Sequence, residues 1–168
     1  GLLLLSRTPR ALVLAITGFT VGHSITLALA TLGVVDAPRA PVEIVIALSL
    51  VLVALEVARA DGASQTLSAR WPWLVAGGFG LVHGLGFASA LADLDLAGAR
   101  LAESLLGFNL GVELGQLAFV AVALALARVA TPAIGRHGLR TLATYTIGTA
   151  GIYLVLDRVV ARTVDLLG

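Results

Sequence analysis

Residues Ala11–Val35 read ALVLAITGFTVGHSITLALATLGVV, an apolar run with His23 near its centre. About 20 apolar residues are enough for a helix to cross the hydrocarbon core of a bilayer. This run is therefore long enough to span a membrane as a single helix. Pro9 precedes the run and Pro38 follows it, and proline is typical of positions where a helix begins or cannot continue.

The composition of the whole chain agrees with a membrane protein. Its 168 residues are 58% apolar and 12% charged, with a mean hydropathy of +1.00. Soluble domains average about 45–50% apolar and about 25% charged residues, so the apolar excess must face lipid. The chain has no Cys, which excludes a disulfide scaffold. Its net charge of +1 gives no electrostatic surface for a nucleic-acid partner.

Further apolar runs predict an all-α, polytopic transmembrane bundle of about five membrane-spanning helices. Beyond the first run they cover about Pro41–Ala60, Trp71–Leu94, Leu101–Ala127 and Thr141–Val160. The connections are short, so we expect one domain over residues 1–168. Leu2–Leu5 is expected to be the tail of a missing upstream helix, and because the chain lacks Met, Gly1 is not expected to be the translation start.

The arginines predict how the bundle is oriented. Seven fall on the side that carries the N-terminus, namely Arg7, Arg10, Arg59, Arg70, Arg128, Arg136 and Arg140. Four fall on the other side, namely Arg39, Arg100, Arg158 and Arg162. Positive charge accumulates on the cytoplasmic side of membrane proteins, so the N-terminal side is predicted to be cytoplasmic. Trp71 and Trp73 are predicted to lie at a membrane interface.

Three of the runs carry small residues every four positions. These stripes are Gly18 and Gly22; Ala76, Gly80, Gly84 and Ala88; and Gly107, Gly111 and Gly115. Small residues let membrane helices approach closely, so we expect the first, third and fourth runs to pack together. The second run is mostly Val, Leu, Ile and Ala and is predicted to be peripheral.

Polar side chains mark a candidate site near the bilayer midplane. His23, His83 and Glu113 each lie about twelve or thirteen residues into their runs, and so at a common depth. Asn109 and Gln116 share one helix face with Glu113, at i, i+4 and i+7. Buried polar groups are costly in lipid and usually face protein or a wet cavity. Two imidazoles and a carboxylate suit a divalent metal such as nickel, cobalt or zinc.

Other interpretations of these residues stay open. A membrane histidine is often an interhelical hydrogen-bond partner, and Asn109 and Gln116 can serve only to hold helices together. Glu43 and Glu56 lie near the two ends of their run, where an interfacial role is expected. The sequence has no nucleophile elbow, phosphate loop or zincin motif, so an enzyme is not expected.

The segment Gly18–Leu27 resembles the Phe-Thr-x-x-His-Ser-x-Thr-Leu block of the HupE/UreJ family of membrane proteins. Val42–Ser49, His83–Ala88 and Gly107–Gln116 are similar to further signatures, so the resemblance covers about residues 10–120. The resemblance implies a small permease for nickel or a related cation. The functional positions that it implies are His23, Glu43, His83, Asn109, Glu113 and Gln116.

This chain departs from the nickel-type pattern at defined positions. It lacks the early His-x5-Asp-His motif, which we expect in an upstream helix. Phe79 stands where the second motif has its first histidine, and Gly86 where that motif has a glutamate.

The sequence therefore predicts a multi-pass protein of the bacterial inner membrane that transports a divalent metal cation, with nickel first and cobalt, zinc or copper as alternatives. Its expected partners are the lipid bilayer, the cation and, as a further candidate, a second copy of the chain. No cofactor is firmly expected, and the divalent metal ion is expected as a transported or bound ligand. The alternative is a scaffold or metallocentre-assembly accessory subunit that does not transport. In the absence of metal we expect His23 and His83 to point into the bundle, with at least one of them hydrogen-bonded to a polar neighbour such as Asn109 or Thr20.

Overall fold

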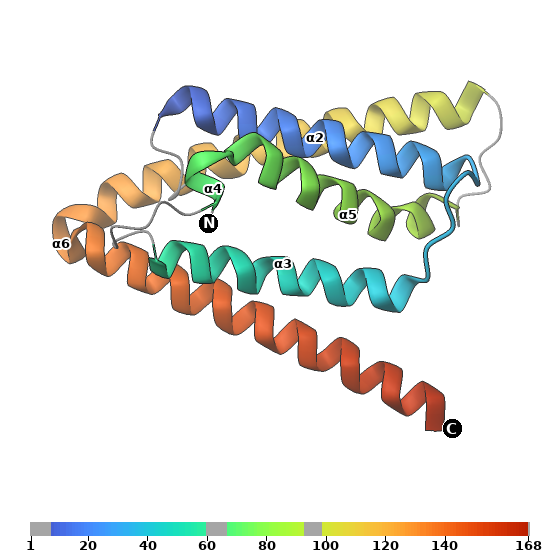
Figure 1. The fold of residues 1–168 in the computed structure, drawn as a ribbon. Helices are drawn as coiled ribbons and strands as arrows, with labels where there is room; N and C mark the ends of the chain where they lie inside the picture. The colour runs from blue at the N-terminus through green and yellow to red at the C-terminus, as the bar shows by residue number, and fades with distance from the viewer. Residues whose placement is uncertain (1–7, 60–66, 93–98, 168) are drawn as a thin grey trace.

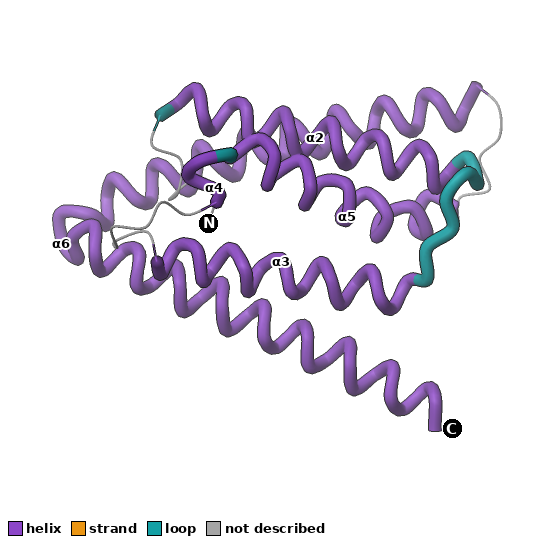
Figure 2. Tube along the Cα trace, in the orientation of Figure 1, coloured by secondary structure: helices purple, strands orange, loops and turns teal. Residues whose placement is uncertain are grey.

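The computed structural model describes residues 8–59, 67–92 and 99–167. In chain order the helices are α2 (Pro9–Thr31), α3 (Arg39–Arg59), α4 (Leu67–Arg70), α5 (Pro72–Ala92) and α6 (Ala99–Leu167) (Figure 1). The described residues contain no strand (Figure 2), so the predicted all-α class is confirmed. The stub Leu2–Leu5 lies outside the described residues.

Helix α6 turns back on itself at Gly135, where φ is 69° and ψ is 169°. Glycine adopts a positive φ without a clash from a Cβ atom, and Pro132 removes one backbone donor from the preceding turn. We call residues 99–134 the first leg and residues 136–167 the second leg. The first leg contacts α2 and the second leg runs beside α3 (Figure 1). The predicted fourth and fifth runs therefore occupy one leg each.

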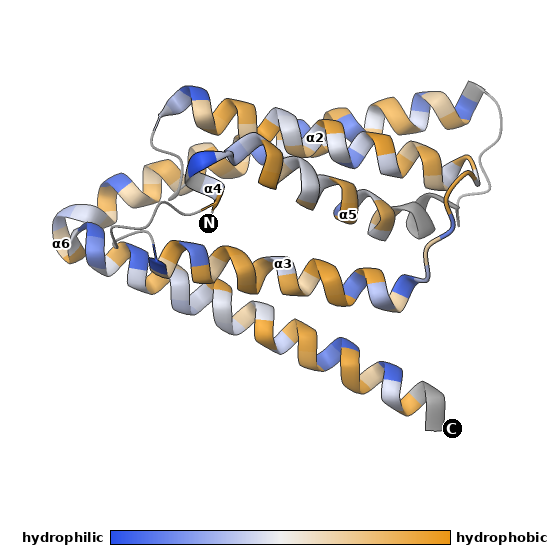
Figure 3. Cartoon of the chain, viewed as in Figure 1, coloured by the Kyte–Doolittle hydropathy of each residue, from blue (hydrophilic) through white to orange (hydrophobic). Residues whose placement is uncertain are grey.

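Three described helices are long and apolar enough to cross a bilayer: Pro9–Thr31, Arg39–Arg59 and Arg100–Val164. A shorter apolar helix covers Pro72–Phe87. Apolar residues run along the length of these helices (Figure 3). The predicted membrane-spanning character is thus supported, while the predicted number of five spans is not confirmed.

Helix α4 marks one end of the bundle. The start of α2, the end of α3, helix α4 and the Gly135 turn lie at the same end (Figure 1), which we call the α4 end. The two oxygens of Glu56 on α3 accept the backbone N–H groups of Leu67 and Ser68 at 3.0 and 2.9 Å and so cap α4. Capping by a carboxylate satisfies amides that a helix start leaves without partners.

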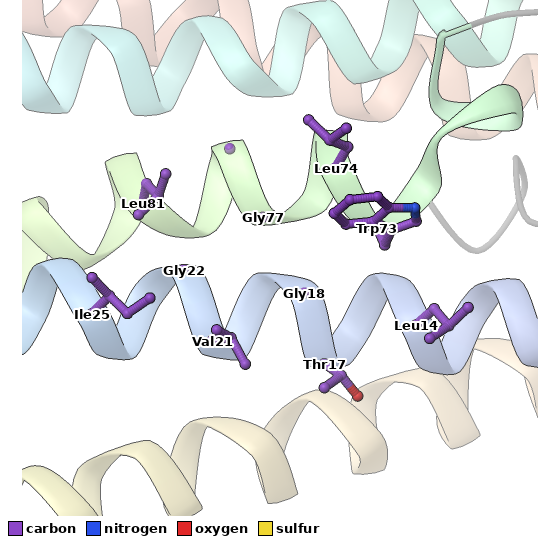
Figure 4. A pocket seen from close by; sticks show the side chains of 11 residues that line it. Leu14, Thr17, Gly18, Val21, Gly22, Ile25, Trp73, Leu74, Gly77 and Leu81 are labelled. Carbon is purple, nitrogen blue, oxygen red and sulfur yellow. The ribbon is translucent and has the colours of Figure 1, made fainter.

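Helices α2 and α5 pack backbone against backbone. A Cβ atom at Gly22 would overlap the carbonyl of Gly77, and one at Gly80 would overlap the carbonyl of Phe19. Figure 4 shows Gly18 and Gly22 along the edge of α2 that faces Gly77 of α5. An open apolar groove of about 510 Å³ lies along this contact. The predicted close approach of the first and third runs is therefore confirmed.

The third glycine stripe does not have the predicted role. Gly107, Gly111 and Gly115 are exposed on the first leg, and an added Cβ would meet nothing within 4 Å at any of them. The prediction that this stripe packs the fourth run against the first and third is wrong. The physical reason is that the first leg turns a different face, which carries amide side chains, toward α2.

The prediction that the second run is peripheral is also wrong. In α3, Ala47, Ala54 and Val57 are only 3%, 4% and 1% exposed. The helix lies against α5 and the second leg, where an added Cβ at Gly151 would press on Val51. The small residues that allow α3 and the second leg to approach closely are glycines of the fifth run and not residues of the second run.

Candidate metal-binding cavity

His23 is buried at the centre of the contact between α2, α5 and the first leg. It is 1% exposed, and its ring centroid lies 5.9, 5.7 and 6.0 Å from those of Phe19, Phe87 and Phe108. Among the described residues neither ring nitrogen has a hydrogen-bond partner. Leaving a buried polar group unpaired costs about 1–3 kcal/mol. An aromatic pocket therefore holds an imidazole whose nitrogens remain available to a ligand.

His83 on α5 has a defined hydrogen-bond partner. Its Nε2 lies 3.3 Å from Oγ of Ser49 on α3, and that hydroxyl donates to the carbonyl of Ile46 at 2.6 Å. A serine hydroxyl has one hydrogen. Because this hydrogen goes to Ile46, Ser49 accepts a hydrogen bond from Nε2–H of His83. The lone pair of His83 is then on Nδ1.

His83 also lines a cavity of about 270 Å³, which we call the His83 cavity. Its walls come from α2, α3, α5 and the first leg, and its polar members are Ser49, His83 and Gln116. Phe19 of α2 lines the same space. Its ring lies 5.3 Å from that of His83, so one phenyl ring contacts both imidazoles.

The polar face of the first leg meets α2. Asn109 Oδ1 lies 2.8 Å from Oγ of Ser24, and Thr20 donates to Oε1 of Gln116 at 3.4 Å. Glu113, half-buried, lies between the two amides on the same face. These amide and hydroxyl contacts hold the first leg where the glycine stripe does not.

The structure brings together some of the predicted site residues and not others. His23 and His83 lie on two packed helices and share the ring of Phe19. Within residues 8–59, 67–92 and 99–167, no three His, Asp or Glu side chains gather into a group that could hold a metal ion. The shared cluster that was expected for His23, His83 and Glu113 is therefore not assembled there. What the structure supplies is the imidazole of His83 and the amide of Gln116 at one cavity. The imidazole of His23 packs against Phe19, which lines the same cavity.

Glu43 does not join the histidines. Its carboxylate lies 2.8 Å from Nε of Arg39 and 3.3 Å from a terminal nitrogen of Arg158. Glu43 precedes Ser49 by six residues, about 9 Å along α3. Its charge is thus balanced at the end of the bundle away from α4, in agreement with the interfacial role.

Sequence reasoning missed Ser49 and the aromatic residues around the histidines. Ser49 carries the only hydroxyl of the run Pro41–Ala60 and has apolar neighbours on both sides, which is a usable signal for a buried partner. Phe19 precedes His23 by one helical turn, so the stacking of the two rings follows from helix geometry. Phe87 and Phe108 reach His23 from other helices and give no such local signal.

The fold and the cavity define a helical membrane protein with histidines and amides between its helices. A model of the HupE/UreJ proteins matches residues 1–158. The chain belongs to the HupE/UreJ family, which is a family of membrane permeases and accessory proteins and not of enzymes. Comparison with curated proteins and with solved structures found no match.

Proposed function

We propose that this protein carries a divalent transition-metal cation across the bacterial cytoplasmic membrane, with nickel as the first candidate and cobalt, zinc or copper after it. It would do so as one domain with five spans, the two legs of α6 supplying the last two. The observation that carries the proposal is two neighbouring imidazoles. His23 is buried and neither of its ring nitrogens has a hydrogen-bond partner among the described residues, and His83 is half-buried and lines the His83 cavity.

The donor set suits such a cation. Neutral imidazole is a good ligand for nickel, copper and zinc, and the lone pair on Nδ1 of His83 is left free by the bond to Ser49. The amide oxygen of Gln116 adds a weaker donor at the same cavity. Glu113 supplies the negative charge that offsets a cation in an apolar surrounding. A few weak donors favour passage, since conduction requires binding that is easily reversed.

A second candidate function is that of an accessory subunit without transport. The observation in its favour is that Asn109 and Gln116 are engaged by Ser24 and Thr20 on α2. In that case these residues would serve only to join helices.

Uptake by the full chain in proteoliposomes separates the two functions. We expect uptake of Ni²⁺ from a panel of Ni²⁺, Co²⁺, Zn²⁺ and Cu²⁺, and its loss in H83A and in H83Q. H137A is the matched control, because His137 is exposed beside the Gly135 turn. An accessory subunit gives no uptake of any of the four cations. Equal uptake by H83A and H137A would remove His83 from the proposed route.

A further inference from the structure

A second cavity lies at the α4 end, next to the His83 cavity. It has a volume of about 420 Å³ and lies between the end of α3, helix α4 and the start of α5. We call it the Glu56 cavity after its one acidic residue. Val53 and Phe79 line both cavities. These two side chains are therefore what separates one space from the other.

The Glu56 cavity contains oxygen donors. The carboxylate of Glu56 is held in place by the two amides of α4, and each oxygen retains a further lone pair. Ser68 lines the cavity and is 1% exposed, and its hydroxyl has no hydrogen-bond partner among the described residues. Arg59, the cationic member of the lining, is exposed at the end of α3. A carboxylate and an unpaired hydroxyl favour a cation over an anion.

The two cavities follow one another along the helices. On α3 the lining residues pass from Glu56 through Val53 to Ser49, and on α5 from Val75 through Phe79 to His83. Glu56 and Ser49 are seven residues apart, which is about 10 Å along the axis of α3. Oxygen donors near the α4 end thus lead to nitrogen donors deeper in the bundle, with an apolar pair between them.

We propose that the Glu56 cavity is the vestibule through which a divalent cation reaches His83, and that Phe79 and Val53 form the barrier between the two spaces. The inference rests on the proposed function for the identity of the cation. Hydrophobic constrictions close a route by excluding water. Phe79 is half-buried, and rotation of its ring away from Val53 would join the two cavities.

Thiol labelling tests the barrier without reference to metal. The chain has no Cys, so S68C and S49C place one near-isosteric thiol in each cavity. A membrane-impermeant, cationic methanethiosulfonate reagent is added to either side of membrane vesicles that contain the full chain. We expect S68C to react from one side and S49C to react from that same side, but more slowly.

Substitutions at the barrier decide the inference. In S49C, F79A and V53A are each expected to raise the labelling rate at least tenfold and F79W to lower it, whereas the rate for S68C stays unchanged. F119A is the control, since Phe119 lines the His83 cavity and does not line the Glu56 cavity. If F79A does not fold, as judged by gel filtration, V53A and F79W give the answer. The inference is overturned if S49C reacts only from the opposite side, or at a rate that does not depend on residues 53 and 79.

Metal uptake keeps the two proposals distinguishable. Labelling that depends on residue 79, together with uptake of none of the four cations, leaves the barrier in place and refutes the proposed function. Uptake that is lost in H83A, together with labelling indifferent to residue 79, keeps the function and refutes this route.

Discussion

At the scale of single residues, the number of hydrogens on Ser49 determines which nitrogen His83 can offer. The hydroxyl gives its hydrogen to Ile46, so His83 must donate from Nε2 and keep a lone pair on Nδ1. Metal-binding histidines commonly have their second nitrogen fixed in this way. His23 has no such partner among the described residues. The two imidazoles are therefore not equivalent, although the sequence places them at the same depth.

Removal of the Ser49 hydroxyl is expected to weaken metal binding without loss of the fold. In S49A the His83 ring loses the group that orients it, and second partners of this kind change metal affinity by about 10- to 100-fold. Titration of Ni²⁺ into the protein in detergent measures the affinity, and nitrogen NMR of labelled histidine reports the tautomer. S49T retains the hydroxyl and is expected to keep both the Ni²⁺ affinity and the tautomer of His83 unchanged. An unchanged tautomer in S49A would contradict the hydrogen-bond assignment.

Glu113 and Glu43, the two glutamates among the candidate site residues, are expected to differ in how much they contribute to Ni²⁺ binding. Glu113 is half-buried with no arginine contact in the described structure, whereas Glu43 is paired with Arg39 and Arg158. A charge in an apolar surrounding acts on a cation with little screening. We expect E113Q to raise the Kd for Ni²⁺ on the order of tenfold and E43Q to change it little. An equal loss of Ni²⁺ affinity in the two variants would contradict a specific role of Glu113 at the cation.

At the scale of helices, the glycine spacing predicts which helices can pack closely but not which helix each of them packs against. All three glycine stripes have the same spacing, yet only those of α2 and α5 meet backbone to backbone. Many pairings of apolar helices have similar energies in lipid, so local contacts decide among them. Here the bonds from Asn109 and Gln116 to α2 turn the stripe of the first leg outward. The polar face was readable from the sequence, but its consequence for the stripe was not.

Alanine at two glycines tests this difference between helices. A Cβ at Gly80 would overlap the carbonyl of Phe19, whereas one at Gly111 would meet nothing within 4 Å. Forced overlap in a packed interior costs about 1–3 kcal/mol, and alanine is about 1 kcal/mol better than glycine in a helix. We expect G80A to be destabilised and G111A to be neutral or stabilised. Unfolding in detergent micelles measures both, and a marked loss of stability in G111A would indicate a contact on the exposed stripe.

At the scale of the whole molecule, composition and run length predicted the helical class and the membrane, and the ordered motifs predicted the family. They did not predict that α3 lies between α5 and the second leg. That position depends on Gly148 and Gly151, which admit Ala54 and Val51, and nothing in α3 itself points to them. The site was predicted in part for the same reason. Depth along a run is readable from one segment, but the face that a residue shows to its neighbours depends on all of them.

The arrangement of ends leads to a prediction on orientation. Arg10 lies in the first turn of α2, Arg70 ends α4, and Arg136 follows the Gly135 turn, all of them elements of the α4 end. Because the arginine excess lies on this side, we expect R10C, R70C and R136C to react with an impermeant thiol reagent from the cytoplasm. Reaction of all three from the other side would reverse the orientation, and a split result would contradict the fold.

The positive φ of Gly135 also sets how thick the molecule is. The apolar stretch Arg100–Val164 has 65 residues, and as one straight helix it would be about 98 Å long. The hydrocarbon core of a bilayer measures about 30 Å, so such a rod would be more than three times too long for it. The reversal divides the stretch near its middle, and its second half runs back beside α3. The turn at Gly135 therefore keeps this segment from extending, as a single rod, far beyond the width of a membrane.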